Sequence, residues 1–211
     1  MQKGAFARAV KSLHGSLIFS RRVEQLARHL AELLPRNASV LDVGTGDGSL
    51  ALRIGRLRPD VTLRGIDLLV RPHTAIPVEA FDGVHFPAAD RSFDVVMFVD
   101  VLHHTDDPRV LLREARRVAR QCILIKDHAA DGWLSGPTLR LMDWVGNAGH
   151  GVRLPYNYWT PAQWQQAFRE LEINVEVNRT ELGLYPGWLN WLFGRSLHFV
   201  VRGAVSPKHG A

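Results

Sequence analysis

The chain has 211 residues, of which 46% are hydrophobic and 22% are charged, and this composition is typical of a soluble globular protein of one domain with a full core. A single cysteine, Cys122, excludes an internal disulfide framework and favours a cytoplasmic location. The net charge of +5 permits weak attraction to nucleic acid or to an anionic membrane, but the arginines are scattered, no nucleic-acid-binding module is recognisable, and the longest uncharged stretch, residues 182–194, is too short to span a bilayer.

The first predicted element is a helix over residues 21–34. Apolar residues recur there with helical spacing, Ser20 can cap its start, and Pro35 stops it. The residues before this helix are basic and amphipathic, and they lack the apolar core of a secretory signal. We therefore expect residues 1–38 to form an N-terminal helical segment.

A short strand over residues 39–42 then runs into a glycine-rich turn, and a helix is predicted over residues 49–56. The turn consists of Asp42, Val43, Gly44, Thr45, Gly46, Asp47 and Gly48. Glycine permits positive φ and lets a ligand lie against bare backbone, and N–H groups at a helix start favour acceptor groups. A dinucleotide fingerprint would need its third glycine at Ser49, and a P-loop would need a lysine that is absent. The carboxylate of Asp42 would repel a phosphate but attract an ammonium group.

Three more strands are predicted, over residues 62–67, 78–81 and 93–99. The first of them ends in Asp67, whose carboxylate can accept hydrogen bonds from both hydroxyls of a ribose. Only 15 residues separate Asp67 from Asp82, and two prolines lie between them, so we expect no full helix in this connection. The strand over residues 93–99 is almost continuously apolar, which indicates burial on both faces.

The rest of the chain continues this alternation. Further helices are predicted over residues 107–120, 133–145 and 160–170, and further strands over residues 123–125, 173–177 and 197–202. We expect residues 133–159 to form a lid or substrate-side insertion and residues 203–211 to form a frayed tail, all within one domain over residues 1–211. Strands that alternate with helices favour a parallel sheet covered on both faces, with ligands bound beyond the carboxyl ends of the strands.

Four features in this order resemble the class I S-adenosylmethionine-dependent methyltransferases, in their broad small-molecule branch. They are the glycine turn, Asp67, the segment 81–94 with Asp82 and Gly83, and the segment 95–107 that contains Leu102-His103-His104. The resemblance implies an α/β fold with three Rossmann-like layers. Its seven-stranded sheet would be mostly parallel, with an antiparallel last strand, the strand order 3-2-1-4-5-7-6, and here a shortened connection between the second and third strands.

The resemblance also implies an enzyme. It would transfer a methyl group by in-line displacement from S-adenosyl-L-methionine, leaving S-adenosyl-L-homocysteine, to an oxygen, nitrogen or carbon of a small, partly apolar or aromatic acceptor. Asp67 would bind the ribose, Asp82 would bind the adenine amino group, and Gly83 would offer a backbone donor to the ring. The residues expected to bind the cofactor are Asp42, Gly44, Thr45, Gly46, Gly48, Asp67, Leu68, Asp82, Gly83, Val99, Asp100 and His104.

A catalytic base is needed only where the acceptor atom carries a proton at the working pH. The candidates are His104, His103 and Asp127, on the loops after the fourth and fifth strands, and histidine titrates in the useful range. Alternatively, one of the two histidines only packs or caps beside the cofactor. The residues expected to line the substrate are His128, Tyr156, Tyr158, Trp188 and Trp191, although these aromatic side chains could equally form a satellite core.

No metal site is expected. His103, His104 and Asp106 could suggest one, as could His128 and Asp131, but adjacent histidines rarely aim at one ion and no cysteine cluster supports zinc. Two rival functions remain open: a nucleic-acid methyltransferase, against which the absence of a base-flipping motif weighs, and a non-catalytic cofactor-binding subunit. Peripheral membrane contact through Trp188, Trp191 and the basic N-terminal helix is a weaker alternative. The acceptor and the oligomeric state are not identified by the sequence.

Overall fold

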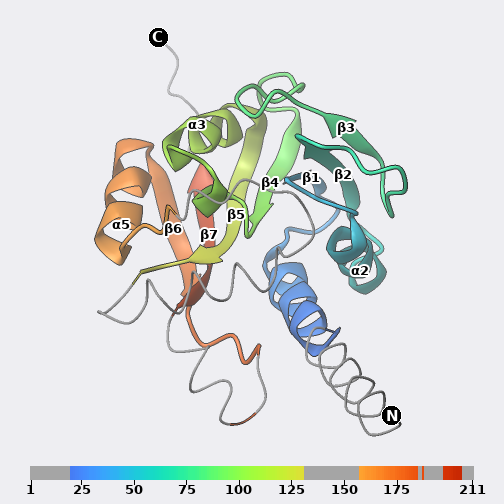
Figure 1. Cartoon of the computed structure of the whole chain (residues 1–211), viewed down its shortest axis with the longest axis horizontal. Helices are drawn as coiled ribbons and strands as arrows, with labels where there is room; N and C mark the ends of the chain where they lie inside the picture. Colours follow the sequence, from blue (N-terminus) through green and yellow to red (C-terminus); the bar gives the residue numbers. More distant parts are fainter. Residues whose placement is uncertain (1–19, 131–156, 185–186, 188–196, 206–211) are drawn as a thin grey trace, which may run out of the picture.

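The computed structural model describes residues 20–130, 157–184, 187 and 197–205 (Figure 1). These residues build one seven-stranded sheet with the strand order β3-β2-β1-β4-β5-β7-β6. In chain order the strands are β1 (Ser39–Val43), β2 (Thr62–Asp67), β3 (Val78–Ala80), β4 (Phe93–Val99), β5 (Ala119–His128), β6 (Ile173–Arg179) and β7 (His198–Val205). The strands β1 to β5 pair in parallel, whereas β7 runs antiparallel to both β5 and β6. The predicted fold class and strand order are confirmed.

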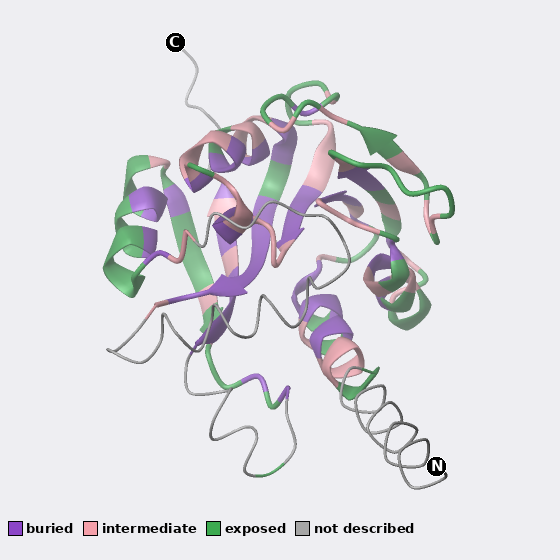
Figure 2. Cartoon of the chain, in the orientation of Figure 1, coloured by how far each residue is buried: buried purple, intermediate pink, exposed green. Residues whose placement is uncertain are grey.

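Helices cover both faces of this sheet, which makes the three layers (Figure 1). The described part of the first helix, residues 20–33, and α2 (Ser49–Leu57) lie on one face, while α3 (Pro108–Val118) and α5 (Pro161–Glu170) lie on the other. Alternate residues of the central strands feed the two cores: Val96 and Ile123 pack with α3 and α5, and Met97 and Leu124 pack with the first helix. The central strands are therefore buried on both faces, as Figure 2 shows, and exposure increases at the edge strands β3 and β6.

Local sequence signals explain where the helices on the second face begin. Thr160 forms a capping box with Gln163, and Pro161 occupies the first position of α5. Asp107 caps α3 by accepting a hydrogen bond from the backbone N–H of Arg109. These two helix starts are as predicted.

Several boundaries differ from the predictions. The helix expected to reach residue 120 ends at Val118, and β5 runs from Ala119 to His128 rather than only over its apolar centre. The frayed tail expected from Gly203 is wrong for residues 203–205, because β7 continues to Val205 and pairs there with β5 and β6. The middle position of β7 explains this result, since both of its edges form backbone hydrogen bonds.

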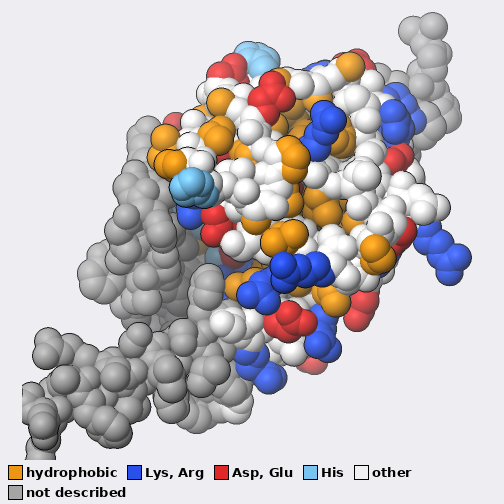
Figure 3. Space-filling view, turned by 90° about the vertical axis from the view of Figure 1, so that its right-hand side faces the viewer, with side chains coloured by type: hydrophobic (Ala, Val, Ile, Leu, Met, Phe, Trp, Pro, Cys, Tyr) orange, Lys and Arg blue, Asp and Glu red, His pale blue; other side chains and the backbone are white. Residues whose placement is uncertain are grey.

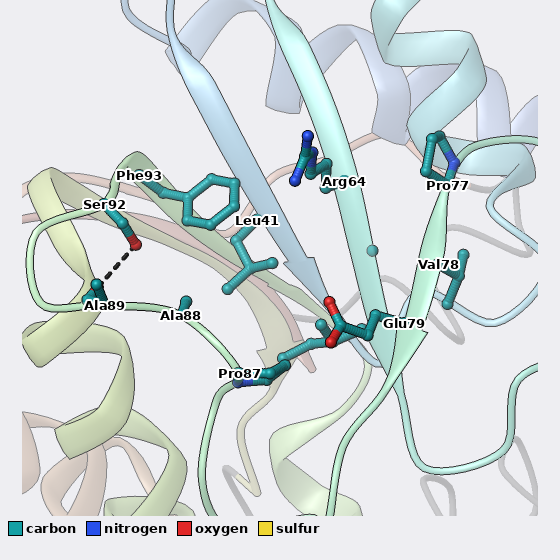
Figure 4. A pocket seen from close by; sticks show the side chains of 12 residues that line it. Leu41, Arg64, Pro77, Val78, Glu79, Pro87, Ala88, Ala89, Ser92 and Phe93 are labelled. Carbon is teal, nitrogen blue, oxygen red and sulfur yellow. Dashed lines mark hydrogen bonds between the residues drawn. The ribbon is translucent and has the colours of Figure 1, made fainter.

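The connections around β3 carry no helix, as predicted for the first of them. The segment between β2 and β3 instead folds back over the glycine turn, where the N–H of Ala75 donates to the carbonyl of Asp47 at 2.8 Å. On the sheet face that α3 and α5 cover, the helix-free segment between β3 and β4 leaves a groove of about 350 Å³ (Figure 4). Leu41, Ile66 and Phe93 line this groove together with the charged side chains of Arg64 and Glu79. Because β1 and β2 contribute mid-strand residues, the groove lies on the sheet face and not at the carboxyl ends.

Candidate functional site

The glycine turn between β1 and α2 has a backbone that only glycine adopts readily. Gly44, Gly46 and Gly48 have φ values of 70°, 62° and 74°. A Cβ atom on Gly44 would also lie only 2.6 Å from the side chain of Val101, which follows β4. The turn therefore lies directly beside the end of β4, at the place where the strand order reverses and where doubly wound sheets bind ligands.

Asp42 lies beneath this turn and is almost completely buried, with 4% of its surface exposed. Burial raises the pKa of Asp42 to about 7; the hydroxyl of Thr45, which donates to the carboxylate at 2.6 Å, acts in the opposite direction, and the charge of Asp67 adds to the increase. The carboxyl group is thus close to half-ionised at neutral pH. A cation that approached it would favour the ionised form.

Asp67, at the end of β2, braces the turn from the side. One carboxylate oxygen accepts the backbone N–H of Gly46 at 2.8 Å, and the other accepts the N–H of Leu69 at 3.0 Å. A carboxylate oxygen has two acceptor positions, so each one retains room for a ligand hydroxyl. The sequence indicated that Asp67 could bind ligand hydroxyls. It did not indicate that Asp67 braces the turn, because nothing in the local pattern shows a contact to Gly46.

The residues expected around the adenine come together beside this carboxylate. Gly83 has a φ of 86°, and a Cβ there would lie 2.9 Å from the side chain of Leu68, which is largely exposed. Asp82 accepts hydrogen bonds from the backbone N–H groups of Val84 and His85 and pairs with the ring nitrogen Nδ1 of His85. These hydrogen bonds lower the pKa of Asp82 to about 2. The short connections therefore place an apolar side chain, a bare backbone and an ionised carboxylate at one edge of the turn.

The second part of the site is a buried histidine–aspartate pair. Nδ1 of His103 lies 2.6 Å from Oδ1 of Asp127, and the two side chains are 1% and 0% exposed. Backbone N–H groups of Leu102 and His128 also donate to this carboxylate, at 2.9 and 2.7 Å. Burial alone would raise the pKa of Asp127, but the charge and hydrogen bond of His103 outweigh it, so the pKa lies below its usual range. The carboxylate thus orients the imidazole and can stabilise its protonated form.

His104 takes a different place from His103. Its ring centroid lies 4.0 Å from that of His103, and the hydrogen bond with Asp127 belongs to His103. Both histidines come from η1 (Leu102–His104), a single 3₁₀ turn after β4. The sequence could not separate their roles, because adjacent residues in an irregular turn point in directions that no periodicity predicts.

The third part of the site is a group of charged side chains around the end of β4, of which the sequence had indicated only Asp100. Asp100 follows β4 at a φ of 56°, and its carboxylate accepts hydrogen bonds from Lys126 and, at 3.1 Å, from Arg22 of the first helix. Burial would raise the pKa of Asp100, but the charges of Lys126 and Arg22 outweigh it and hold it well below the usual range. Burial lowers the pKa of the fully buried Lys126. Val99, the preceding residue, packs against the core on the side of the first helix.

Further imidazole and phenol rings lie around the pair of His103 and Asp127. The ring of Tyr158 stacks on His103 at 5.5 Å, and His128 lies 4.8 Å from His103 and 4.7 Å from His198, its direct partner on β7. Burial, with a contribution from Lys126, lowers the pKa of His128 well below its usual value, so this ring stays neutral. Tyr156, Trp188 and Trp191 lie outside the described residues.

The ligand atoms of His103, Asp127 and His128 lie within 4.8 Å of one another. This set differs from both sets that the sequence suggested, and Asp131 lies outside the described residues. The carboxylate of Asp127 already accepts hydrogen bonds from His103 and from the backbone N–H groups of Leu102 and His128, which is the arrangement of a carboxylate that orients an imidazole.

The sequence model of a family described as "Methyltransferase domain" matches residues 18–179, which include every strand up to β6. The chain belongs to the class I S-adenosylmethionine-dependent methyltransferase family. The four sequence features that resembled this family, which are the glycine turn, Asp67, the segment with Asp82 and Gly83, and the turn after β4, all lie within the matched residues.

One relative of known activity is the 27-O-demethylrifamycin SV methyltransferase of Amycolatopsis mediterranei (strain S699). It is 33% identical over 111 residues, which are 46% of this chain and 40% of the relative. The match therefore spans less than half of the relative's length.

Solved structures show the same fold at low identity. The complex of the Haloferax volcanii Trm112 methyltransferase activator with a putative methyltransferase aligns with a TM-score of 0.65 at 15% identity, over 88% of this chain and 91% of that chain. Geranyl diphosphate C-methyltransferase from Streptomyces coelicolor A3(2), solved with Mg²⁺, geranyl diphosphate and S-adenosyl-L-homocysteine, aligns with a TM-score of 0.64 at 11% identity, over 86% and 78% of the two chains. Among the described residues of this chain, no helix is long and apolar enough to cross a membrane.

Proposed function

We propose that this methyltransferase binds S-adenosyl-L-methionine at the glycine turn and methylates a hydroxyl oxygen of a small acceptor, with His103 as the general base. The observation that carries the choice of oxygen is the buried pair of His103 and Asp127, 2.6 Å apart. A neutral hydroxyl group is a weak nucleophile and must lose its proton during transfer, whereas a neutral amine can attack before it loses one.

The chain's own residues fit the cofactor. Asp67 offers acceptor positions for the ribose hydroxyls, and Leu68 and Gly83 together offer an apolar edge and a bare backbone for the adenine. Asp42 and the positive-φ glycines lie beneath the same surface. When bound, the cofactor supplies a methyl group that its sulfonium already makes electrophilic. The protein's part is then to position the acceptor in line, which can contribute effective molarities of roughly 10⁵ M or more.

The proton of the acceptor would pass to His103. Because Nδ1 of His103 faces Asp127, proton removal would use Nε2. Asp127 cannot rotate away, since the N–H groups of Leu102 and His128 hold it from two sides. The stacked ring of Tyr158 would form one wall for a planar or apolar acceptor.

Segment 133–159 would complete this wall within a single domain. Asn157, close to its end, supports that placement, because its backbone N–H donates to the carbonyl of His103 at 3.3 Å and its side chain donates to the carbonyls of Thr105 and Asp106 at 3.0 Å. These hydrogen bonds tie Asn157 to the turn that carries His103.

The test compares His103→Ala with His104→Ala. Release of S-adenosyl-L-homocysteine is measured with a panel of phenols and aliphatic alcohols. Acceptors that would be methylated at nitrogen or at carbon serve as a comparison. We expect His103→Ala to lower kcat by about 10²- to 10⁴-fold, with recovery as the pH approaches the pKa of the acceptor hydroxyl, and His104→Ala to lower it much less. Equal kcat values for wild type and His103→Ala, with an unchanged pH profile, would refute the role of His103.

A further inference from the structure

A second cavity, of about 280 Å³, lies between α5 and the strands β6 and β7 at the end of the sheet (Figure 1). Three buried rings line its inner wall, and they belong to Trp164 and Phe168 of α5 and to Phe199 of β7. Uncharged polar side chains stand at its exposed rim, namely Gln165, Asn178 and Thr180. None of the described residues that line the cavity is charged.

The cavity exists because α5 covers only the first part of β6. Ile173, at the start of the strand, is 4% exposed, whereas Val175, which points to the same face, is 40% exposed. Beyond the β-bulge that follows Val175, Asn178 lies opposite Val201 of β7, whose side chain packs in the core on the α5 side. The second half of β6 thus offers a partly apolar wall that the described helices leave open.

The charges of the two strands lie on the other face of the sheet. Arg179 pairs with Glu32 of the first helix, which covers that other face. Arg202 follows Val200 by two residues, and Val200 packs with the first helix, so the guanidinium lies on the same side, where it pairs with Glu176. A charged ligand would lose its hydration in the cavity without finding a counter-charge in the described lining. An uncharged ligand avoids this cost.

The cavity is separate from the glycine turn but adjoins the buried pair. The turn follows β1, which β4 and β5 separate from β7 and β6. Trp164, in contrast, donates its indole N–H to the carbonyl of His128 at 3.2 Å, and the backbone N–H of His128 donates to Asp127. A molecule in the cavity would therefore contact a ring that is hydrogen-bonded beside Asp127, without lying on the proposed cofactor surface.

From these features we propose that the cavity binds a small, uncharged, planar molecule, at a site separate from those of the cofactor and the acceptor. An apolar cavity of roughly 150 Å³ is enough for benzene, so this one has room for a single substituted ring. The aromatic inner wall suits the faces and edges of such a ring. The amides of Gln165 and Asn178 can donate and accept hydrogen bonds, so a polar group at one end of the ligand would face the rim.

Benzamide and benzoate test the site, because they have nearly the same shape and only benzoate is charged. In NMR titrations of the ¹⁵N-labelled full chain, benzamide should shift the indole N–H signal of Trp164 with a dissociation constant of about 0.1–1 mM. Benzoate should bind at least about tenfold more weakly. Trp164→Phe identifies the signal by its loss from those of the six tryptophans. Saturation with S-adenosyl-L-homocysteine should leave the affinity for benzamide unchanged.

Two variants of β6 locate the binding. Val175→Phe adds bulk to the wall of the cavity and should weaken benzamide binding at least about tenfold. Asn174→Phe is the matched control, because it adds a ring at the neighbouring exposed position, on the opposite face of the strand. It should bind benzamide as the wild type does, and the dispersed NMR spectrum of each variant checks that it is folded.

Any of four results would overturn the proposal. Benzamide would leave the Trp164 signal unchanged, benzoate would bind as tightly as benzamide, or the two variants of β6 would bind benzamide alike. The fourth result is competition between benzamide and S-adenosyl-L-homocysteine, which would assign the benzamide to the cofactor surface.

Discussion

Asp42 and Asp127 are both buried carboxyl groups at the carboxyl-terminal edge of the sheet, and their environments move their pKa values in opposite directions. Burial raises the pKa of Asp42 to about 7, because only the Thr45 hydroxyl opposes it with a neutral hydrogen bond. At Asp127 the charge and hydrogen bond of His103 outweigh burial and lower the pKa. The difference suits two tasks: a group that responds to an approaching cation, and a permanently ionised group that orients a base.

Asp42 makes the stability of the cofactor-free protein depend on pH. Its pKa of 3.8 in the unfolded chain rises to about 7 on folding, so between these values the folded protein keeps a proton that the unfolded chain loses. The free energy of unfolding therefore falls by roughly 1.4 kcal/mol per pH unit across this window, about 4 kcal/mol in all, and is flat above it. Asp42→Asn should lack this slope. Urea unfolding of both proteins from pH 4.5 to 8 measures it, and parallel curves would contradict the pKa of Asp42.

Asp67 serves both the turn and the proposed ligand. Asp67→Ala removes the acceptor of the Gly46 N–H and the acceptor positions for the ribose, so we expect the dissociation constant of S-adenosyl-L-homocysteine to rise about tenfold or more. Glu79→Ala is the control, because it removes the same charge from an exposed position on the neighbouring strand β3. An unchanged calorimetric affinity in Asp67→Ala would remove the cofactor from this turn.

Residues whose roles depend on local backbone could be predicted from the sequence, and residues whose roles depend on distant partners could not. Glycines need their own backbone conformation, and Asp42 and Asp67 lie at or next to the ends of strands that the sequence predicts. Arg22 meets Asp100 across 78 residues, and Lys126 meets it across 26. Such pairings follow from strand order, and in the sequence Lys126 is only a charged residue next to the apolar centre of β5.

At the scale of elements, the predictions were best where a helix start has a chemical signal. Asp107-Pro108 and Thr160-Pro161 mark helix starts that the structure confirms. The end of β5 was missed because the polar residues 126–128 are buried by their neighbours rather than marked by their own pattern. The end of β7 was missed because Gly203 and Ala204 are residue types that are uncommon in strands. His128 and His198 pair directly across β5 and β7, and each would be expected at the surface if taken alone.

Gly203 shows why β7 must be read as a central strand. It lies between Ile123 of β5 and Val175 of β6, and a Cβ on it would approach Cγ2 of Ile173 to 2.3 Å. Ile173 is buried and branched at Cβ, so it cannot move aside easily. Gly203→Ala should therefore lower the free energy of unfolding by about 1–3 kcal/mol. Ala204→Ser, at the next position, should change it by no more than about 0.5 kcal/mol; equal urea midpoints for the two variants would show that the sheet yields at Gly203.

At the scale of the whole molecule, the loss of helices around β3 concentrates the ligand surface on short loops. The segment that replaces the helix after β2 lies on the glycine turn, with the side chain of Ile76 against Gly48. The segment after β3 leaves the groove beside Leu41 and Phe93 on the other face (Figure 4). Prolines in the sequence predicted the first missing helix, but the fold-back contact depends on a turn whose shape only the structure shows.

On the part of the chain that the structure describes, many basic side chains are paired with acidic ones. Along α3, Arg109 pairs with Glu170, Arg116 with Glu172, and Arg117 with Glu114. On the face shown in Figure 3, basic and acidic side chains are interspersed. Neutralised arginines release few counterions from a nucleic acid.

These charges lead to a test of the rival function. Fluorescence anisotropy with a short RNA and a short DNA duplex should show weak binding at 0.05 M NaCl that is lost at about 0.2 M, because only non-specific phosphate contacts are available. Neither nucleic acid should accept a methyl group, whereas a hydroxylated small molecule should. Binding that persists at 0.2 M NaCl, together with saturable methylation of either nucleic acid, would assign the acceptor site to a nucleotide. In that case the ring of Tyr158 would stack on the target base, and the role of His103 as a base for a small alcohol would have to be given up.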